Sequence, residues 1–394
     1  MNILLINDYF EDGGAEAVFR EQYEILQNDF CIEMFYAFKY LPDKKISPLS
    51  YIYSFKFKKQ LNTLLSKHHF DCIIVHNYIS AFSPSILDSL KRYKKENKCK
   101  IIYYAHDYQL ICPNRGYNYF SKGKRFNFKS PPSLYNILTK RLHEKGIAYS
   151  ILKKTQWIFA YSIFNKQKVF DLVLAPSDFL VKQIKLRYPD LKIQRMYNLC
   201  NSLDINRQIN PKEKYSVLRL VFFGRLDPAK GLVEFIEALR FSTIDYSFTI
   251  IGDGVEFPII QNIIERYGLN DRVILKQKQN QAELFAGLPN YDVFVLPSLW
   301  YENAPLSIVE AASLGLDLFL SNHGGVLEIG KLCKVKHFFN PFDKDDVVSK
   351  LEILYKDFIA GDLPKADLKQ LHTLFSGETY IENLKKHIMP VELC

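Results

Sequence analysis

Residues 218–231 read LRLVFFGRLDPAKG, an apolar run followed by a short polar turn that holds two glycines and two cations. A run of branched and aromatic residues that ends at a glycine predicts a buried strand. The next stretch, Leu232–Leu239, has the apolar spacing of a helix. A strand, a turn and a helix in this order make half of a βαβ unit, so residues 218–239 predict a domain built on a parallel sheet.

The same alternation runs through the whole chain. Short apolar runs predict strands in the first half at Ile3–Ile6, Cys31–Tyr36, Asp71–Val75, Lys100–Ala105 and Leu172–Ala175. In the second half they predict strands at Leu218–Gly224, Ser247–Ile251, Val273–Leu275, Asp292–Leu296 and Asp317–Leu320. Amphipathic stretches between them predict helices, for example at Ala15–Gln27, Pro258–Tyr267 and Pro305–Leu314. Two such series predict an α/β protein with two doubly wound, Rossmann-like domains.

The length of 394 residues also favours two domains, because a single hydrophobic core rarely serves so long a chain. The polar stretch 201–215 has the composition of a linker. It would separate an N-terminal domain, residues 1–200, from a C-terminal domain, residues 216–376. Residues 377–394 then form a terminal segment, in which Gly377–His387 predicts one more helix.

Composition argues against several classes of protein. The seven cysteines are scattered singly and form no CxxC pair, which is not the pattern of a disulfide framework or a zinc site. The first eight residues read as a strand and not as a signal peptide. No apolar stretch approaches the ~18 residues that would span a bilayer. We therefore expect a cytoplasmic protein, soluble or peripheral at the inner face of the membrane.

Charge is divided unevenly between the halves. Residues 1–200 carry a net charge of +14 and the remainder −5, and residues 51–200 alone hold 27 basic against 8 acidic side chains. In 51–69 and 121–170 the basic residues alternate with bulky apolar ones. This pattern favours a peripheral membrane surface for a lipid-linked acceptor. A solvated charged face stays open, whereas no nucleic-acid motif supports nucleic acid as a partner.

Two glycine turns directly follow predicted strands. Gly13 and Gly14 open the first predicted helix, and Gly224 begins the turn that carries Arg225 and Lys230. Glycines let backbone N–H groups approach an anion closely, and the dipole of the following helix favours negative charge there. Two fixed cations suit a diphosphate leaving group, although plain turns with solvated cations remain the other interpretation. Neither turn has the GxGxxG pattern of a nicotinamide dinucleotide site.

The stretch 296–311, LPSLWYENAPLSIVEA, places two glutamates seven residues apart. With a helix that begins near Pro305, Glu302 lies in the preceding loop and Glu310 lies inside the helix. Glu310 could then accept hydrogen bonds from the vicinal hydroxyls of a ribose, while Glu302 faces the sugar. Free backbone N–H groups at the helix start would point toward the same ligand. The residues there are Asn303, Ala304, Pro305 and Leu306, and all of them except the proline have a backbone N–H group.

These motifs occur in the order seen in a known enzyme family. GGAE at 13–16, GRLDPAKG at 224–231, IGDG at 251–254, the paired glutamates and GGVLE at 324–328 resemble the retaining GT-B glycosyltransferases of family 4. Many of these build capsule, exopolysaccharide and lipopolysaccharide. His76-Asn77 and His106-Asp107 in the first half are similar as well. The resemblance spans nearly the whole chain, and its specific part lies in the second domain.

The resemblance implies a role for each matched residue. Arg225 and Lys230 would bind the donor diphosphate, with Gly13 and Gly14 against the phosphate. Glu310 would bind the ribose, while Glu302 and His106 would contact the transferred sugar. It further implies a cleft between facing domains, a last helix that crosses back onto the first domain, and a reaction that needs no metal or other cofactor. Asp343-Lys344-Asp345 reads as a helix cap.

The sequence thus predicts a hexosyltransferase that moves a sugar from a UDP- or GDP-linked donor to a glycan or a lipid-linked oligosaccharide with retention of configuration. Two alternatives remain. One is a nucleotide-sugar epimerase or phosphorylase of the same fold. The other is a basic protein without enzymatic activity that binds membrane or nucleic acid.

Overall fold

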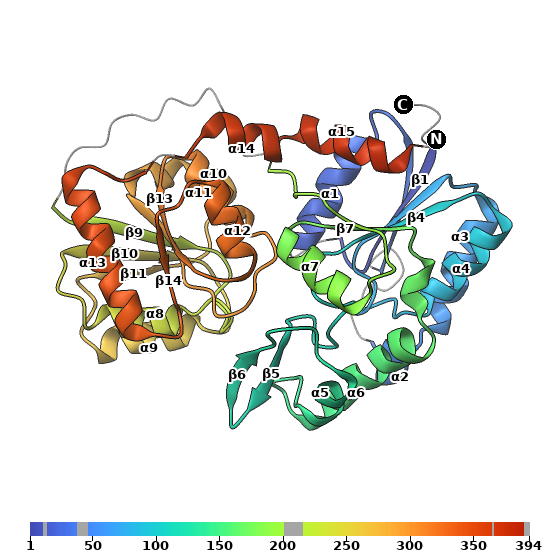
Figure 1. The fold of residues 1–394 in the computed structure, drawn as a ribbon, viewed down its shortest axis with the longest axis horizontal. Helices are drawn as coiled ribbons and strands as arrows, with labels where there is room; N and C mark the ends of the chain where they lie inside the picture. The colour runs from blue at the N-terminus through green and yellow to red at the C-terminus, as the bar shows by residue number, and fades with distance from the viewer. Residues whose placement is uncertain (11–13, 38–45, 201–215, 365, 390–394) are drawn as a thin grey trace. The chain divides into compact units, whose positions relative to one another are not determined.

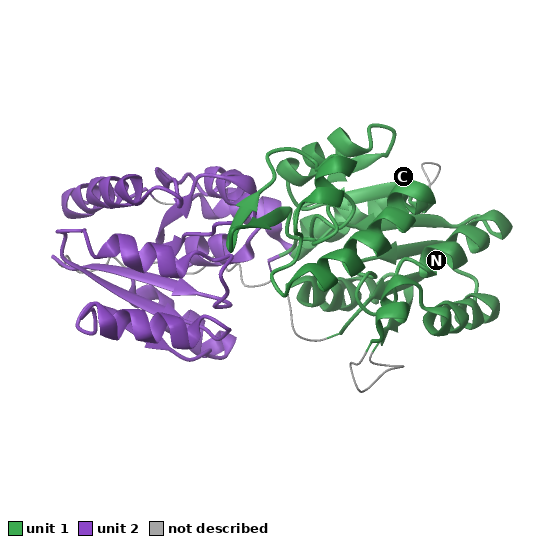
Figure 2. Ribbon diagram, turned by 90° about the horizontal axis from the view of Figure 1, so that it is seen from below, with its two compact units in different colours: residues 1–199, 377–394 green, residues 200–376 purple. Residues whose placement is uncertain are grey.

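The structure, a computed structural model, describes residues 1–10, 14–37, 46–200, 216–364 and 366–389. The chain forms two compact units (Figure 2). Unit 1 comprises Met1–Leu199 with Gly377–Cys394, and unit 2 comprises Cys200–Ser376. The predicted linker, 201–215, lies outside the described residues.

Unit 1 is built on a six-stranded parallel sheet in the order β2-β1-β3-β4-β7-β8 (Figure 1). The strands are β1 (Asn2–Asn7), β2 (Cys31–Tyr36), β3 (Cys72–Val75), β4 (Lys100–Tyr104), β7 (Leu172–Ala175) and β8 (Ile193–Arg195). Its α-helices are α1 (Gly14–Leu26), α2 (Pro48–Ile52), α3 (Phe55–Lys67), α4 (Ile86–Glu96), α5 (Leu134–Thr139), α6 (Ile147–Trp157), α7 (Asp178–Arg187) and α15 (Gly377–Ile388).

The basic segment 121–170 contains more structure than the sequence indicated. An antiparallel hairpin pairs β5 (Asn118–Ser121) with β6 (Lys124–Asn127). Its two-residue turn, Lys122-Gly123, has positive φ at both positions, as the tight turns of hairpins require. After α6 the chain continues in a π-helix, η2 (Ile158–Ile163), and a 3-10 helix, η3 (Lys166–Val169).

Unit 2 has a second six-stranded parallel sheet, in the order β11-β10-β9-β12-β13-β14. The strands are β9 (Leu218–Phe223), β10 (Tyr246–Ile251), β11 (Val273–Lys276), β12 (Val293–Leu296), β13 (Asp317–Ser321) and β14 (His337–Phe339). The helices are α8 (Leu232–Leu239), α9 (Phe257–Arg266), α10 (Gln281–Gly287), η4 (Leu288–Asn290), α11 (Leu306–Ser313), α12 (Gly324–Leu332), α13 (Lys344–Ala360) and α14 (Leu368–Phe375).

Both sheets are buried on their two faces, because consecutive residues of their central strands are inaccessible to solvent. In unit 1, α1 packs its Val18, Phe19 and Leu26 on one face of the sheet. The terminal helix α15 joins this same core through Tyr380, Leu384 and Ile388. Sequential strand–helix alternation with buried strands confirms the predicted pair of Rossmann-like domains.

Candidate functional site

The order of the strands in unit 2 marks where a ligand binds. Numbered along the chain, the strands of this sheet run in the order 3-2-1-4-5-6. Successive connections from β9 therefore lead toward one edge of the sheet, and those from β12 lead toward the other. Ligands of such sheets bind at this switch point, at the edge where the strands end in their carboxyl termini. The loops that follow β9 and β12 are residues 224–231 and 297–305, which carry the predicted glycine turn and the first of the paired glutamates.

Glycines pack these loops against each other. A Cβ at Gly231 would lie 2.3 Å from the carbonyl oxygen of Pro297, and a Cβ at Gly252 would lie 2.0 Å from that of Gly224. At Gly325, the second residue of α12, a Cβ would lie 1.6 Å from the carbonyl oxygen of Asn303. Each distance is far shorter than a real contact, so only glycine permits this arrangement. The loops after β9, β10, β12 and β13 therefore form one packed surface.

Lys230 and Glu302 are brought together by this packing. The Lys230 Nζ donates to Glu302 Oε1 at 2.6 Å, and Ser298 Oγ donates to the same oxygen at 2.9 Å. The backbone carbonyl of Glu302 also accepts from the N–H of Gly325 at 2.7 Å. Glu302 is only 8% exposed, so its carboxylate is fixed in one orientation. The predicted cation at Lys230 is thus one half of a largely buried ion pair.

Arg225 occupies a different environment in the same loop. Its side chain is 69% exposed and its Nε lies 2.6 Å from Asp227 Oδ2. The other oxygen of Asp227 accepts from the backbone N–H of Ala229 at 2.9 Å. Asp227 therefore orients Arg225 while leaving most of the guanidinium in solvent. Gly224 precedes it with φ of 144°, a conformation that favours glycine.

Glu310 lies in the second turn of α11, half-buried. Its carboxylate makes no hydrogen bond or ion pair with any residue that the structure describes. Burial raises the pKa of this carboxyl group to about 7. Pro305 is the N-cap of α11, one residue before the helix begins, and Asn303, Ala304, Pro305 and Leu306 are all half-buried. A carboxylate with unused acceptor oxygens beside a helix N-terminus is suited to bind hydroxyl groups.

Several side chains of this edge were not among the predicted site residues. Ser298 and Asp227 orient Glu302 and Arg225, as described above. His323, the N-cap of α12, lies with its Nε2 3.1 Å from the carbonyl oxygen of Trp300, and burial lowers its pKa. Each of these residues follows a strand directly or lies within a turn of a predicted site residue, and this position is the signal that could have identified them.

In unit 1, the corresponding edge collects polar residues after β1, β3 and β4. The Asp8 carboxylate accepts from the backbone N–H groups of Ser80, Ala81 and Phe82 at 2.7–3.0 Å. The Nε of Arg115 donates to Asp107 at 2.5 Å and one of its terminal nitrogens donates to Ser80 Oγ at 3.0 Å. Gly14 is the first residue of α1, whereas Gly13 lies outside the described residues.

His106 ends a chain of hydrogen bonds that begins on the terminal helix. Gln22 Nε2 donates to the Tyr380 hydroxyl at 2.8 Å, so Gln22 Oε1 faces His76 Nε2, also at 2.8 Å. His76 Nδ1 in turn lies 2.7 Å from His106 Nε2. Gln22 and Tyr380 were not among the predicted site residues, because they lie 358 residues apart and no local pattern links them.

This chain defines the protonation of both imidazoles. Burial lowers the pKa of His76 well below its usual value, and burial followed by repulsion from Arg115 lowers that of His106 to about 3. Both rings are therefore neutral at pH 7. Since Gln22 Oε1 can only accept, His76 Nε2 carries the hydrogen and His76 Nδ1 accepts from His106 Nε2. The Nδ1 of His106 is consequently the nitrogen with the lone pair.

Comparison with known proteins identifies the second unit. Residues 204–366 match the family described as glycosyl transferases group 1. The chain contains a glycosyl transferases group 1 domain. The matched residues include loops 224–231 and 297–305, which form the switch-point edge described above. The second unit accordingly carries a glycosyltransferase domain, and the fold of the two Rossmann-like units is that of solved GT-B glycosyltransferases.

Individual relatives agree with this assignment. The chain is 25% identical over 304 residues to an uncharacterized 42.6 kDa protein in the cps region of Klebsiella pneumoniae, covering 77% of this chain and 71% of that one. It is 34% identical over 145 residues to the UDP-Gal:alpha-D-GlcNAc-diphosphoundecaprenol alpha-1,3-galactosyltransferase of Escherichia coli. That match spans about a third of either protein, 34% of each.

Solved structures share the fold at low sequence identity. The apo form of the lipopolysaccharide outer core galactosyltransferase WaaB has a TM-score of 0.67 at 18% identity, covering 98% of this chain and 99% of its own. Anabaena HepE in complex with UDP has a TM-score of 0.61 at 16% identity, covering 98% and 99%. At this identity the similarity supports the fold alone.

Two further findings concern metals and membranes. Within the described ranges, no group of three His, Cys, Asp or Glu side chains is placed to hold a metal ion. The Asp343 carboxylate accepts from the backbone N–H groups of Asp345 and Asp346, which confirms its predicted role as a helix cap.

Among the residues that the structure describes, no helix combines the length and the apolar composition needed to cross a membrane.

Proposed function

We propose that this glycosyltransferase moves a sugar from a UDP- or GDP-linked donor to a glycan or a lipid-linked oligosaccharide during the assembly of a surface polysaccharide. One observation carries the proposal: a half-buried Glu310 carboxylate with unused acceptors lies on α11, the helix that directly follows the loop of the Lys230–Glu302 pair. Relatives support the pathway, since they include proteins from a capsule region, from colanic acid biosynthesis and from amylovoran biosynthesis.

Glu310 would bind the ribose of the donor. Two vicinal hydroxyls can each donate to one carboxylate oxygen, and hydrogen bonds to the charged form lower a carboxyl pKa. The pKa of about 7 in the unliganded protein means that a substantial fraction of Glu310 is protonated at neutral pH. Donor binding would then favour the ionised form and release a proton from that fraction.

Lys230 and Arg225 would bind the diphosphate. The ammonium of Lys230 has three hydrogens and uses one on Glu302, so the others remain for a phosphate oxygen. Arg225, mostly exposed, would close over the phosphates from the loop. Backbone N–H groups at the start of α11 would add to this stabilisation as charge develops on the leaving diphosphate. Glu302, held by Lys230 and Ser298, would face the transferred sugar.

The reaction breaks the bond between the anomeric carbon and the diphosphate oxygen and forms a bond to the acceptor oxygen. The acceptor hydroxyl loses its proton, and the departing diphosphate takes it up. We keep retention of configuration and independence of a metal as parts of this proposal, on the strength of the family resemblance. His106 keeps its proposed contact with the sugar, with its imidazole neutral.

We further propose that the protein is cytoplasmic and contacts the inner face of the membrane through unit 1. Its segments 51–69 and 121–170 expose large apolar side chains among lysines. Phe55 and Tyr135 in these segments, and Leu49 just before the first of them, are each more than 70% exposed. Basic residues interleaved with exposed apolar ones are typical of surfaces that lie on anionic membranes.

Thermal unfolding with UDP, GDP and a panel of their sugars, with and without EDTA, tests the donor assignment. A ligand at a hundred times its Kd adds about 2.7 kcal/mol to the stability of the folded state. We expect one nucleotide to raise the melting temperature of the wild type with or without EDTA, and Glu310→Ala to abolish that shift. A shift that survives in Glu310→Ala would refute the ribose role.

Turnover separates transfer from related reactions. Release of nucleoside diphosphate should require both donor and acceptor. Conversion of the donor without acceptor would indicate an epimerase, and a requirement for inorganic phosphate would indicate a phosphorylase. Either result would overturn the proposed transfer.

A further inference from the structure

Unit 1 contains a cavity beside α4. It has a volume of about 800 Å³ and lies between α4, the end of α2, and the segment that runs from α6 through η2 to η3. A volume of this size is in the range of sites for small organic ligands. None of the predicted site residues lines it.

The floor of this groove is apolar. Leu87 of α4, Ala160 of η2 and Val169 of η3 are buried there, at 1%, 3% and 5% exposure. Phe159 and Phe164 line the same groove but are 47% and 60% exposed. They stack on each other with ring centroids 6.3 Å apart. The groove thus joins a buried hydrocarbon surface to aromatic rings that reach into solvent.

Phe159 lies within the π-helix η2, and Phe164 directly follows it. The wider turn of this helix pairs the N–H of Phe164 with the carbonyl oxygen of Phe159, five residues back. Insertion of one extra residue into a helical turn rotates the following side chains relative to those before it. Such π-bulges are rare and are frequent at functional sites.

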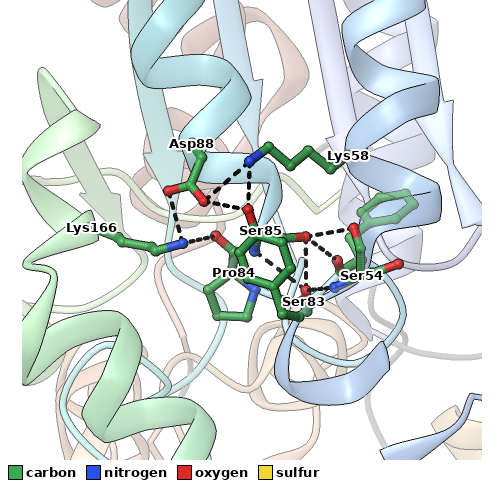
Figure 3. A network of polar contacts seen from close by, with 9 residues as sticks. Ser54, Lys58, Ser83, Pro84, Ser85, Asp88 and Lys166 are labelled. Carbon is green, nitrogen blue, oxygen red and sulfur yellow. Dashed lines mark hydrogen bonds and ion pairs between the residues drawn. The ribbon is translucent and has the colours of Figure 1, made fainter. Parts of the chain in front are cut away.

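A fixed polar network borders the groove, and Figure 3 shows Pro84, Asp88 and Lys166 in it. Asp88 accepts from the Tyr53 hydroxyl at 3.0 Å and pairs with the Lys166 Nζ at 2.8 Å. Lys58 lies 3.7 Å from the same carboxylate on its other side. The lone acidic side chain among the lining residues is therefore neutralised by two lysines.

The rim of the groove carries unpaired positive charge. Five lysines and one aspartate are among the lining residues. Lys91 and Lys95 are exposed and lie four residues apart, on one face of α4, and Lys168 is exposed on η3. None of these three forms an ion pair with a residue that the structure describes. An apolar floor with a basic rim is complementary to an amphiphile with a hydrocarbon chain and an anionic head.

We propose that this groove binds one anionic phospholipid of the membrane, with an acyl chain along the apolar floor and the phosphate at Lys91, Lys95 and Lys168. The inference rests on the proposed membrane contact of unit 1 and names its lipid. A free phosphate ion would leave the apolar floor unused, whereas a phospholipid uses both features. The exposed Phe159 and Phe164 would enter the interface beside the bound lipid.

Photo-crosslinking tests the site directly. The whole protein is mixed with phosphatidylcholine vesicles containing phosphatidylglycerol that carries a diazirine in its acyl chain, and the cross-linked peptides are identified by mass spectrometry. We expect cross-links within residues 84–95 and 156–169. Cross-links confined to other parts of the chain would overturn the proposal.

Variants measure the contribution of the basic rim and of the exposed aromatic rings. Lys91→Glu combined with Lys95→Glu should weaken binding to these vesicles by at least about 30-fold, the factor that corresponds to ~1 kcal/mol for each of two lysines. Phe164→Ser, at an exposed position, should reduce the groove cross-links. Lys182→Glu combined with Lys185→Glu makes the same charge change on α7 and should weaken binding less than threefold.

Equal loss in the rim pair and in the α7 pair would refute a localised site and leave general charge attraction as the explanation. Donor binding is measured with the same variants, so that failure of the lipid site can be distinguished from failure of the proposed function. Neither pair belongs to the donor-binding edge, so the melting shift with nucleotide should be that of the wild type. A nucleotide shift without groove cross-links would refute the lipid site alone.

Discussion

Replacement of Glu310 by glutamine should stabilise the protein at alkaline pH while it weakens donor binding. The pKa of Glu310 is raised from 4.5 to about 7 by burial in the folded state. The folded protein therefore binds more protons than the unfolded chain between these values, and stability falls as pH rises through this window. Glutamine cannot ionise, so Glu310→Gln removes this loss.

The expected size follows from the two pKa values. A shift of about 2.5 units corresponds to about 3 kcal/mol when the carboxyl is fully ionised, at ~1.36 kcal/mol per unit. Glu310→Gln should thus be more stable than the wild type by about 1 kcal/mol at pH 5 and about 3 kcal/mol at pH 8. For a unit of this size the latter would raise Tm by roughly 6–12 °C.

Urea unfolding of both proteins at pH 5 and pH 8 measures the difference. Glu265→Gln, at an exposed position of α9, is the control and should change stability by less than ~0.5 kcal/mol at either pH. In the same preparation, Glu310→Gln should bind the nucleotide about tenfold more weakly, because a charge-assisted hydrogen bond becomes a neutral one. A variant no more stable than the wild type at pH 8 would refute the reasoning.

Further predictions concern the packed edge and the terminal helix. Lys230→Ala should lower turnover by two or more orders of magnitude, in line with the roughly 2.7–4 kcal/mol lost on deletion of one oxyanion-hole donor; near-wild-type kcat would exclude Lys230 from leaving-group stabilisation. Gly325→Ala should lower Tm, because its Cβ overlaps a backbone oxygen, whereas Gly14→Ala, with open space around it, should not. Tyr380→Phe should cost about 1–3 kcal/mol in urea unfolding, because the amide of Gln22 loses a buried acceptor; an unchanged midpoint would contradict this.

Much of the fold could be predicted from the sequence because parallel strands buried on both faces are continuous apolar runs. All ten predicted strands are present within one or two residues of their expected ends. Strands β8 and β14 were not predicted, because they have only three residues each and lie at the edges of their sheets. The β5–β6 hairpin, whose lysines and aromatic residues were interpreted only as a charged surface, was not predicted either.

The candidate site was predictable in part. Glycine turns and strand ends indicated which loops meet, because parallel strands end at a common edge. The pairing of Lys230 with Glu302 was not predicted, since it joins residues 72 positions apart and depends on the close contact at Gly231. The hydrogen-bond chain from Tyr380 to His106 is still less local. No sequence pattern indicates which buried polar groups will find one another.

The position of α15 affects how unit 1 can fold during synthesis. Its Tyr380, Leu384 and Ile388 complete a core whose other members lie between Ile3 and Leu199. All of unit 2 is translated in between. At roughly 5–20 residues per second, the ribosome needs about 10–35 s to traverse those 177 residues. During that interval part of the apolar face of the nascent N-terminal unit remains uncovered. Chaperones can bind to this face until α15 has been synthesised and covers it.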